Sequence, residues 1–103
     1  MHKLLKIIKL SKMKTKVSNL TSTRSGREVS NQFEIQTSEG RFFQSYDSII
    51  VFIPADGSKI QLDERYWNYS KTTSKYRNEF LRETTKETQA KIDSGAYKLV
   101  NLN

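Results

Sequence analysis

The sequence predicts a small α+β domain, in which an antiparallel β-sheet of meander order carries one or two short helices on one face. Short segments in the middle of the chain alternate apolar and polar residues, as half-buried strands do. Turn-forming residues separate these segments at close intervals. After Asp63 the apolar residues take up helical spacing instead. A length of 103 residues fits one domain, near the small end of the size that buries an adequate core.

The first sixteen residues carry almost all of the net charge. They contain no acid and contribute +6 of the total +7 through six lysines: Lys3, Lys6, Lys9, Lys12, Lys14 and Lys16. We therefore divide the chain into a basic arm, residues 1–16, and a nearly neutral domain, residues 17–103. A cationic arm attracts polyanions, namely nucleic acid or an anionic membrane surface, through Coulombic attraction and counterion release.

The start of the arm, residues 3–9, fits either a helix or an edge strand. At about 100° per residue, its aliphatic side chains fall on one arc of about 160°, opposite the lysines: Leu4, Leu5, Ile7 and Ile8. This amphipathic stretch lasts about two turns, too short for a helix that is stable alone in water. The β-branched pair Ile7-Ile8 also suits an edge strand with lysines facing solvent.

The middle of the chain predicts the strands. Residues 18–30 are polar, with a turn at residues 24–27, and the first clear strand follows, where Phe33 and Ile35 alternate with polar neighbours. A turn at residues 38–40 leads to a second alternating strand over residues 41–46. The apolar run at residues 48–53 is typical of a central strand.

Pro54 ends the central strand because it has no N–H to donate to a ladder. Asp56-Gly57 then predicts a type I′ hairpin turn, which needs a positive φ at both central positions. Ile60 and Leu62 return on the next strand.

The last third predicts two helices and a final strand. The first helix presents one face, with Tyr69 at or before its start: Tyr69, Thr73, Tyr76 and Phe80. Thr84 and Glu87 have the spacing of a capping box, so a second helix begins there and ends at residues 94–95. Tyr97, Leu99 and Leu102 suit a C-terminal strand.

The residue content argues against an enzyme. The single histidine, His2, stands beside Met1 without a second group to orient it, and the chain has no cysteine. Carboxylates are not clustered with a lysine as in metal-dependent nucleases, and the four glycines are scattered rather than gathered in a phosphate-binding loop. We expect no catalytic residue, no metal site and no cofactor.

A basic stripe is predicted on the first helix if that helix runs on past Thr84. Its members recur at i, i+4, i+7, i+11 and i+15: Lys71, Lys75, Asn78, Arg82 and Lys86. Such a stripe could lie along a phosphate backbone. The simpler interpretation is a solvated outer face, which Glu79 and Glu83 close by favour.

Four aromatic residues are candidates for a protein interface wherever they are exposed: Phe42, Tyr46, Tyr66 and Trp67. Aromatic side chains dominate interface hot spots, and on sheets they also stack against single-stranded nucleic acid. Because the chain has few aliphatic residues, packing in the core is the simpler interpretation for the rings of residues 41–46 and 66–69.

Three stretches resemble a family of small, uncharacterised bacteriophage proteins. They are Thr23–Val29 with Asn31-Gln32-Phe33, then Phe43–Tyr46 with Ser48-Ile49-Ile50, and above all Tyr69–Leu81, YSKTTSKYRNEFL. The resemblance runs from about Met13 to the end of the chain. It implies a phage-encoded protein acting inside the host cell and implies no particular activity.

The arm and the resemblance together predict a non-enzymatic nucleic-acid-binding accessory protein. The alternative is a protein-binding inhibitor of host machinery, and the third interpretation is association with the virion or a membrane surface. No apolar run approaches the ~20 residues that span a bilayer, and lysines interrupt the apolar start, so we expect neither a membrane span nor a cleaved signal. The expected location is the cytoplasm of an infected bacterium, with the virion as an alternative.

Overall fold

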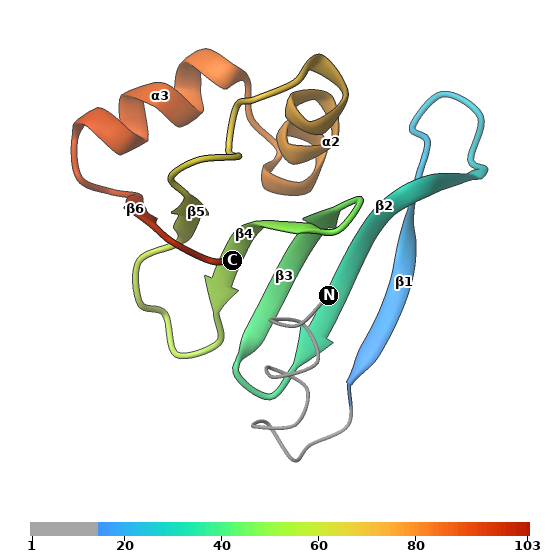
Figure 1. The fold of residues 1–103 in the computed structure, drawn as a ribbon, viewed down its shortest axis with the longest axis horizontal. Helices are drawn as coiled ribbons and strands as arrows, with labels where there is room; N and C mark the ends of the chain where they lie inside the picture. Colours follow the sequence, from blue (N-terminus) through green and yellow to red (C-terminus); the bar gives the residue numbers. More distant parts are fainter. Residues whose placement is uncertain (1–14) are drawn as a thin grey trace.

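A computed structural model of the chain describes residues 15–103 as a six-stranded sheet with two helices (Figure 1). The elements follow in chain order: β1 (Lys16–Thr21), β2 (Glu28–Thr37), β3 (Gly40–Ser45), β4 (Ser48–Pro54), β5 (Gln61–Asp63), α2 (Lys71–Leu81), α3 (Thr85–Asp93) and β6 (Lys98–Val100). The strands lie in the sheet in this same order. The predicted α+β meander is confirmed, although the last pair of strands, β5 and β6, is parallel.

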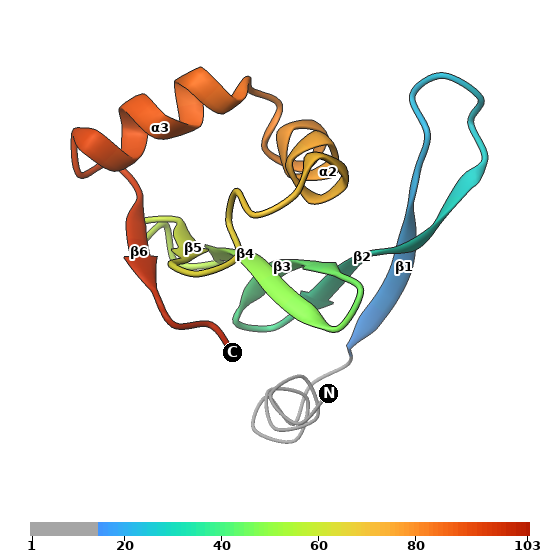
Figure 2. The same cartoon turned by 45° about the horizontal axis from the view of Figure 1, so that its top comes forward.

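Both helices lie on the same side of the sheet, which we call the helix face (Figure 2). The main core is here, where Phe80 of α2 packs with its ring centroid 5.6 Å from that of Phe43. The opposite side, the far face, carries a second cluster of buried apolar residues: Ile35, Phe42 and Ile49. Strand β3 is therefore buried on both faces, since Phe42 and Phe43 point in opposite directions.

Strand β1 was not predicted from the sequence, which indicated only a polar connection over residues 18–30. Instead β1 pairs antiparallel with β2, with Val17 opposite Ile35. The predicted turn is present between them, where Ser22 N–H donates to the Arg27 carbonyl at 2.8 Å. An edge strand is held by backbone hydrogen bonds along one side and can stay polar, so it lacks the alternating pattern that marked β2.

The predicted type I′ turn at Asp56-Gly57 is wrong. Only Gly57 has a positive φ, +81°, and the connection runs on to Ile60 before β5 begins. The Asp56 side chain closes the turn, since its Oδ1 accepts hydrogen bonds from the backbone N–H of Ser58 at 2.9 Å and from the Ser58 hydroxyl. A side-chain turn of this kind replaces the backbone conformation that a two-residue hairpin would need.

The helix ends are set by local capping. Ser70 begins α2 by accepting from the Thr73 N–H at 3.1 Å, so Tyr69 precedes the helix. The predicted capping box of α3 is confirmed, with both the Thr84–Glu87 bonds present. The last strand is shorter than predicted, because Tyr97 and Leu102 lie outside it.

Asp63 ties the end of β5 to the C-terminal tail. Its carboxylate is buried and accepts three backbone hydrogen bonds, from Arg65 and Tyr66 on one oxygen and from Leu102 on the other, at 2.9–3.1 Å. Because a buried carboxylate is stable only when it is hydrogen-bonded, this residue fixes where the chain leaves the sheet and where the tail returns.

Candidate functional site

The predicted basic stripe is not continuous, because α2 ends at Leu81. Arg82 is its C-cap, with left-handed φ and ψ of 58° and 47°, and the chain turns before α3 begins at Thr85. The prediction required a helix running past Thr84, and the capping box at Thr84 starts a new helix instead. Lys71 and Lys75 therefore lie on α2, and Lys86 on α3, as exposed but separate cations.

The side chain of Asn78 makes internal hydrogen bonds and does not lie on the solvated face of α2. Its Oδ1 accepts from Arg77 Nη2 at 2.8 Å, and its Nδ2 donates to Thr85 Oγ1 at 3.2 Å. These bonds join α2 to the first turn of α3. We therefore remove Asn78 from the candidate contacts for phosphate.

Arg77 is the residue that the sequence reasoning missed. It is fully buried, and its guanidinium lies 5.0 Å from the Trp67 ring. Its two terminal nitrogens donate to five oxygen acceptors: the Trp67 carbonyl and the side chains of Asn68, Ser74, Asn78 and Thr85. The signal was present in the spacing, because Arg77 follows Thr73 by four residues and so falls on the buried face of α2.

Among residues 15–103, no carboxylate is hydrogen-bonded to this buried guanidinium. Burial lowers the pKa of Arg77, and the more distant Glu83 carboxylate opposes that shift. An arginine nevertheless remains charged at any ordinary pH. The charge is stabilised by oriented carbonyl, amide and hydroxyl dipoles and by the Trp67 ring, which together fasten the loop before α2 to both helices.

Replacing Arg77 with methionine should destabilise the fold by about 2–4 kcal/mol, because buried acceptors lose their donor. Arg77→Lys should recover only part of this loss, since an ammonium cannot match the planar fork of a guanidinium. Urea unfolding measures both, with Arg24→Met in the exposed turn after β1 as the control. An Arg77→Met change within about 0.5 kcal/mol of the parent would contradict the structural role.

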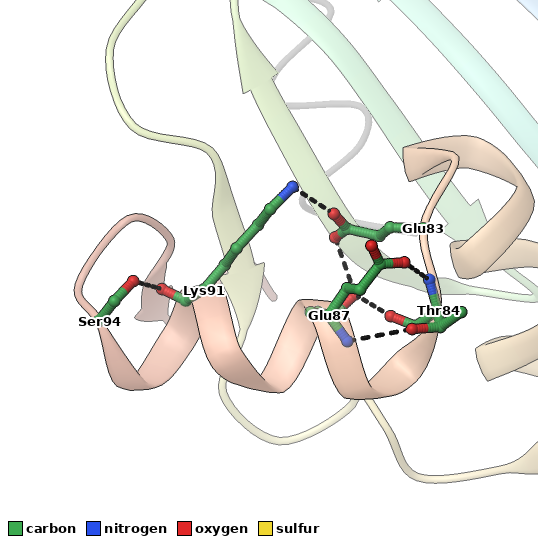
Figure 3. A network of polar contacts seen from close by, with 6 residues as sticks. Glu83, Thr84, Glu87, Lys91 and Ser94 are labelled. Atoms are coloured by element: carbon green, nitrogen blue, oxygen red, sulfur yellow. Dashed lines mark hydrogen bonds and ion pairs between the residues drawn. The ribbon is translucent and has the colours of Figure 1, made fainter.

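A second polar network surrounds Glu83, just after α2 (Figure 3). Its carboxylate is nearly buried and accepts from Lys91 Nζ at 2.6 Å and from Thr88 Oγ1 at 2.8 Å. Burial alone would raise the pKa of this carboxyl. Hydrogen bonds from Lys91, Thr88 and Tyr97 outweigh that effect and hold the pKa of Glu83 below its usual range.

Because the pKa of Glu83 is lowered in the folded protein, its stabilising contribution is complete above the unfolded-state pKa and is lost as the pH falls through the folded value. We expect Glu83→Gln to cost about 1–2 kcal/mol at neutral pH and to flatten the loss of stability between about pH 5 and 3. Chemical unfolding across this pH range checks it. Equal acid sensitivity in Glu83→Gln and the parent, with Glu64→Gln as an exposed control, would refute the account.

A groove of about 270 Å³ separates the first hairpin from α2. Arg41 crosses it: its Nε lies 3.0 Å from Glu34 Oε2, and its guanidinium lies 5.0 Å from the Phe80 ring centroid. The groove is lined by Leu20, Thr21, Thr23, Glu34, Arg41, Glu79, Phe80 and Arg82. Because two arginines face two glutamates, the groove has no strong electrostatic preference for phosphate.

The four candidate interface aromatics differ in exposure. Phe42 is buried on the far face and stacked on Phe52 at 4.4 Å, so it cannot serve as an anchor. Tyr66 and Trp67 are half-buried, and Trp67 turns its ring to Arg77. Tyr46 is 51% exposed.

Tyr69, which the sequence grouped with Thr73, Tyr76 and Phe80 at or before the start of the first helix, is equally exposed and meets the Tyr66 ring edge-on at 5.2 Å. It precedes the N-cap Ser70 and so does not belong to the helix.

The arm lies almost entirely outside the described residues, including its lysines at 3, 6, 9, 12 and 14. Lys16 is the first residue of β1 and is exposed. Within residues 15–103 no group of acidic and histidine side chains is arranged to hold a metal ion. In the same range no helix is long and apolar enough to cross a membrane.

Residues 8–95 match the model of a family of unknown function, DUF8033. The chain belongs to this family. The DUF8033 region begins within the arm and ends two residues after α3, so it includes β1 to β5 and both helices but not β6. No curated protein and no solved structure matches the chain.

Proposed function

We propose that the protein binds nucleic acid without catalysing a reaction and that the lysine-rich arm supplies most of the contact. The observation that carries the proposal is the charge distribution, +6 over residues 1–16 against +1 over the remaining residues. Neutralising phosphates and releasing their counterions supplies essentially all of non-specific nucleic-acid affinity.

Exposed cations of the folded domain would extend this footprint. Within residues 15–103 the ion pairs are Arg41 with Glu34 and Lys91 with Glu83, so Lys71, Lys75 and Lys86 form no ion pair there. Lys16 lies close enough to Glu34 to help lower the pKa of that carboxyl. Lys71 and Lys75 lie in the first half of α2, whose first turn has no acidic residue. The positive end of a helix dipole adds to their potential instead of opposing it, which favours an approaching phosphate.

The resemblance of the chain to small bacteriophage proteins supports a phage origin as part of the same proposal. A small basic accessory protein would then act in the cytoplasm of an infected bacterium or be packaged with the genome in the virion. Membership of DUF8033 adds no activity to this picture.

The proposal predicts a steep salt dependence that belongs to the arm. If six lysines contact duplex phosphates, the slope of log affinity against log salt is near −5, from about −0.9 for each contact. Replacing Lys3, Lys6, Lys9, Lys12, Lys14 and Lys16 with glutamine should remove most of this slope. Fluorescence anisotropy with a labelled duplex across a salt series measures both proteins.

The control replaces Lys59 and Lys98, exposed lysines outside the proposed footprint, and should leave the slope unchanged. A melting curve confirms that each variant is folded. An affinity that does not depend on salt concentration, or that is unchanged by the six replacements, would remove the main support for nucleic-acid binding.

A second candidate function, binding to a host protein as an inhibitor, is favoured by Tyr46. This residue is exposed and has a φ of +56°, a conformation that is rare for bulky side chains and costs about 1–3 kcal/mol. A strained, exposed aromatic ring suits a recognition residue.

Tyr46→Asn keeps the backbone conformation and removes the ring. This variant should therefore lose a stoichiometric host protein that the parent retains after nuclease treatment, as co-purification would measure. Retention of the same protein by Tyr46→Asn argues against this interface. A partner that is lost on nuclease treatment is held through nucleic acid, which also argues against it.

A further inference from the structure

The far face of the sheet carries a continuous apolar cluster whose members are almost free of solvent. Ile35, Phe42 and Ile49 are 0%, 4% and 2% exposed, and the half-buried Phe52 and Leu102 pack against them. These residues come from β2, β3, β4 and the tail after β6, so the cluster spans the middle of the sheet. We call it the far-face cluster.

The described part of the chain does not supply a layer that would cover this cluster. Both helices lie on the helix face (Figure 2). The C-terminal tail brings only Leu102 and Asn103, whose side chain bonds the backbone N–H and carbonyl of Ile49, each at 2.8 Å. A sheet face that is apolar needs a second layer packed on it, and residues 15–103 provide that layer on one face alone.

Residues 1–14 have the apolar content to form that layer. Four aliphatic residues occur within five positions, Leu4, Leu5, Ile7 and Ile8, and on a helix they share one arc with lysines opposite. In a strand the same residues would divide between both faces, and Lys6 would share a face with Leu4 and Ile8. A helix therefore presents all four aliphatic side chains to the apolar far face, whereas a strand would not.

The length of chain and the point where it joins the sheet also fit. The segment joins β1 at Thr15, and Val17, two residues later, lies opposite Ile35 on the far face and is 52% exposed. The seven steps from Ile8 to Thr15 span at most about 24 Å. Crossing from β1 to β4 needs about 14 Å, from three strand spacings of about 4.8 Å.

We infer that residues 4–8 pack on the far-face cluster as a short amphipathic helix, with Lys3, Lys6 and Lys9 turned away from the sheet. Two turns of helix are not stable alone, but burial of four aliphatic side chains stabilises them on an apolar surface. Three lysines of the arm are then held in a fixed row. This inference does not depend on nucleic-acid binding and stands if that proposal fails.

Methyl NMR of the full chain tests the placement directly. The expected result is a set of nuclear Overhauser effects between the methyl groups of Ile35 and Ile49 and those of Leu4, Leu5, Ile7 and Ile8. Ile53 and Ile60, which pack on the helix-face core, serve as internal controls and should show none. Isotope-filtered spectra of mixed labelled and unlabelled protein distinguish contacts within one molecule from those between two.

Two variants of the same segment separate packing from charge. The variant with Leu4→Ser, Leu5→Ser, Ile7→Ser and Ile8→Ser should melt about 10 °C or more below the parent. The variant with Lys3→Gln, Lys6→Gln and Lys9→Gln should melt close to the parent temperature. The inference is overturned if the methyl contacts are absent, if they occur only between molecules, or if the serine variant melts with the parent.

Discussion

A sheet that is apolar on both faces imposes the main constraint on this protein. Phe42 and Phe43 are adjacent in β3 and are both buried, so the centre of the sheet needs a covering layer on each side. The helices form one layer, and their position follows from Phe80 packing on Phe43. Residues 15–103 do not supply the second layer, and we infer that the aliphatic residues of the arm form it, in addition to the phosphate contacts that we propose for its lysines.

The helix layer is held together by polar contacts as much as by apolar ones. Arg77 joins the loop before α2 to both helices, and Glu83 joins the end of α2 to Lys91 near the end of α3. Both residues lie inside the layer and leave its outer cations exposed. Lys71, Lys75 and Lys86 are exposed and take no part in these contacts, so they can be replaced without disturbing the polar core, whereas Lys91 cannot.

Elements with a local signature were predictable from the sequence. The alternation around Phe33 and Ile35, and the capping box of Thr84 and Glu87, each depend on neighbouring residues and appear where expected. Strand β1 was not predictable, because a polar edge strand depends on its partner. The break of the basic stripe was signalled by the capping box at Thr84, which predicts a new helix there. The exact end of α2 at Arg82 was not, since arginine is not a residue type that marks a left-handed cap.

The candidate site was predictable in composition but not in geometry. The lysine arm was evident from charge alone, whereas the burial of Arg77 depends on acceptors from Trp67 and Thr85, at sequence distances of ten and eight residues. The helical spacing grouped Asn78 with the basic residues, but its hydrogen bond with Arg77 turns the side chain to an internal contact. Sequence periodicity therefore predicts which face of a helix or strand a residue occupies, but not which side chains from other segments contact it.

The central claim, that the sheet is covered on both faces, is tested most directly by solvent paramagnetic relaxation in the full chain. A soluble gadolinium chelate broadens the signals of side chains that water can reach. The account predicts that Ile35 and Ile49 are protected as strongly as Ile50 and Val51 on the helix face, while Val17 is broadened. Broadening of Ile35 and Ile49 to the level of Val17 would contradict the claim.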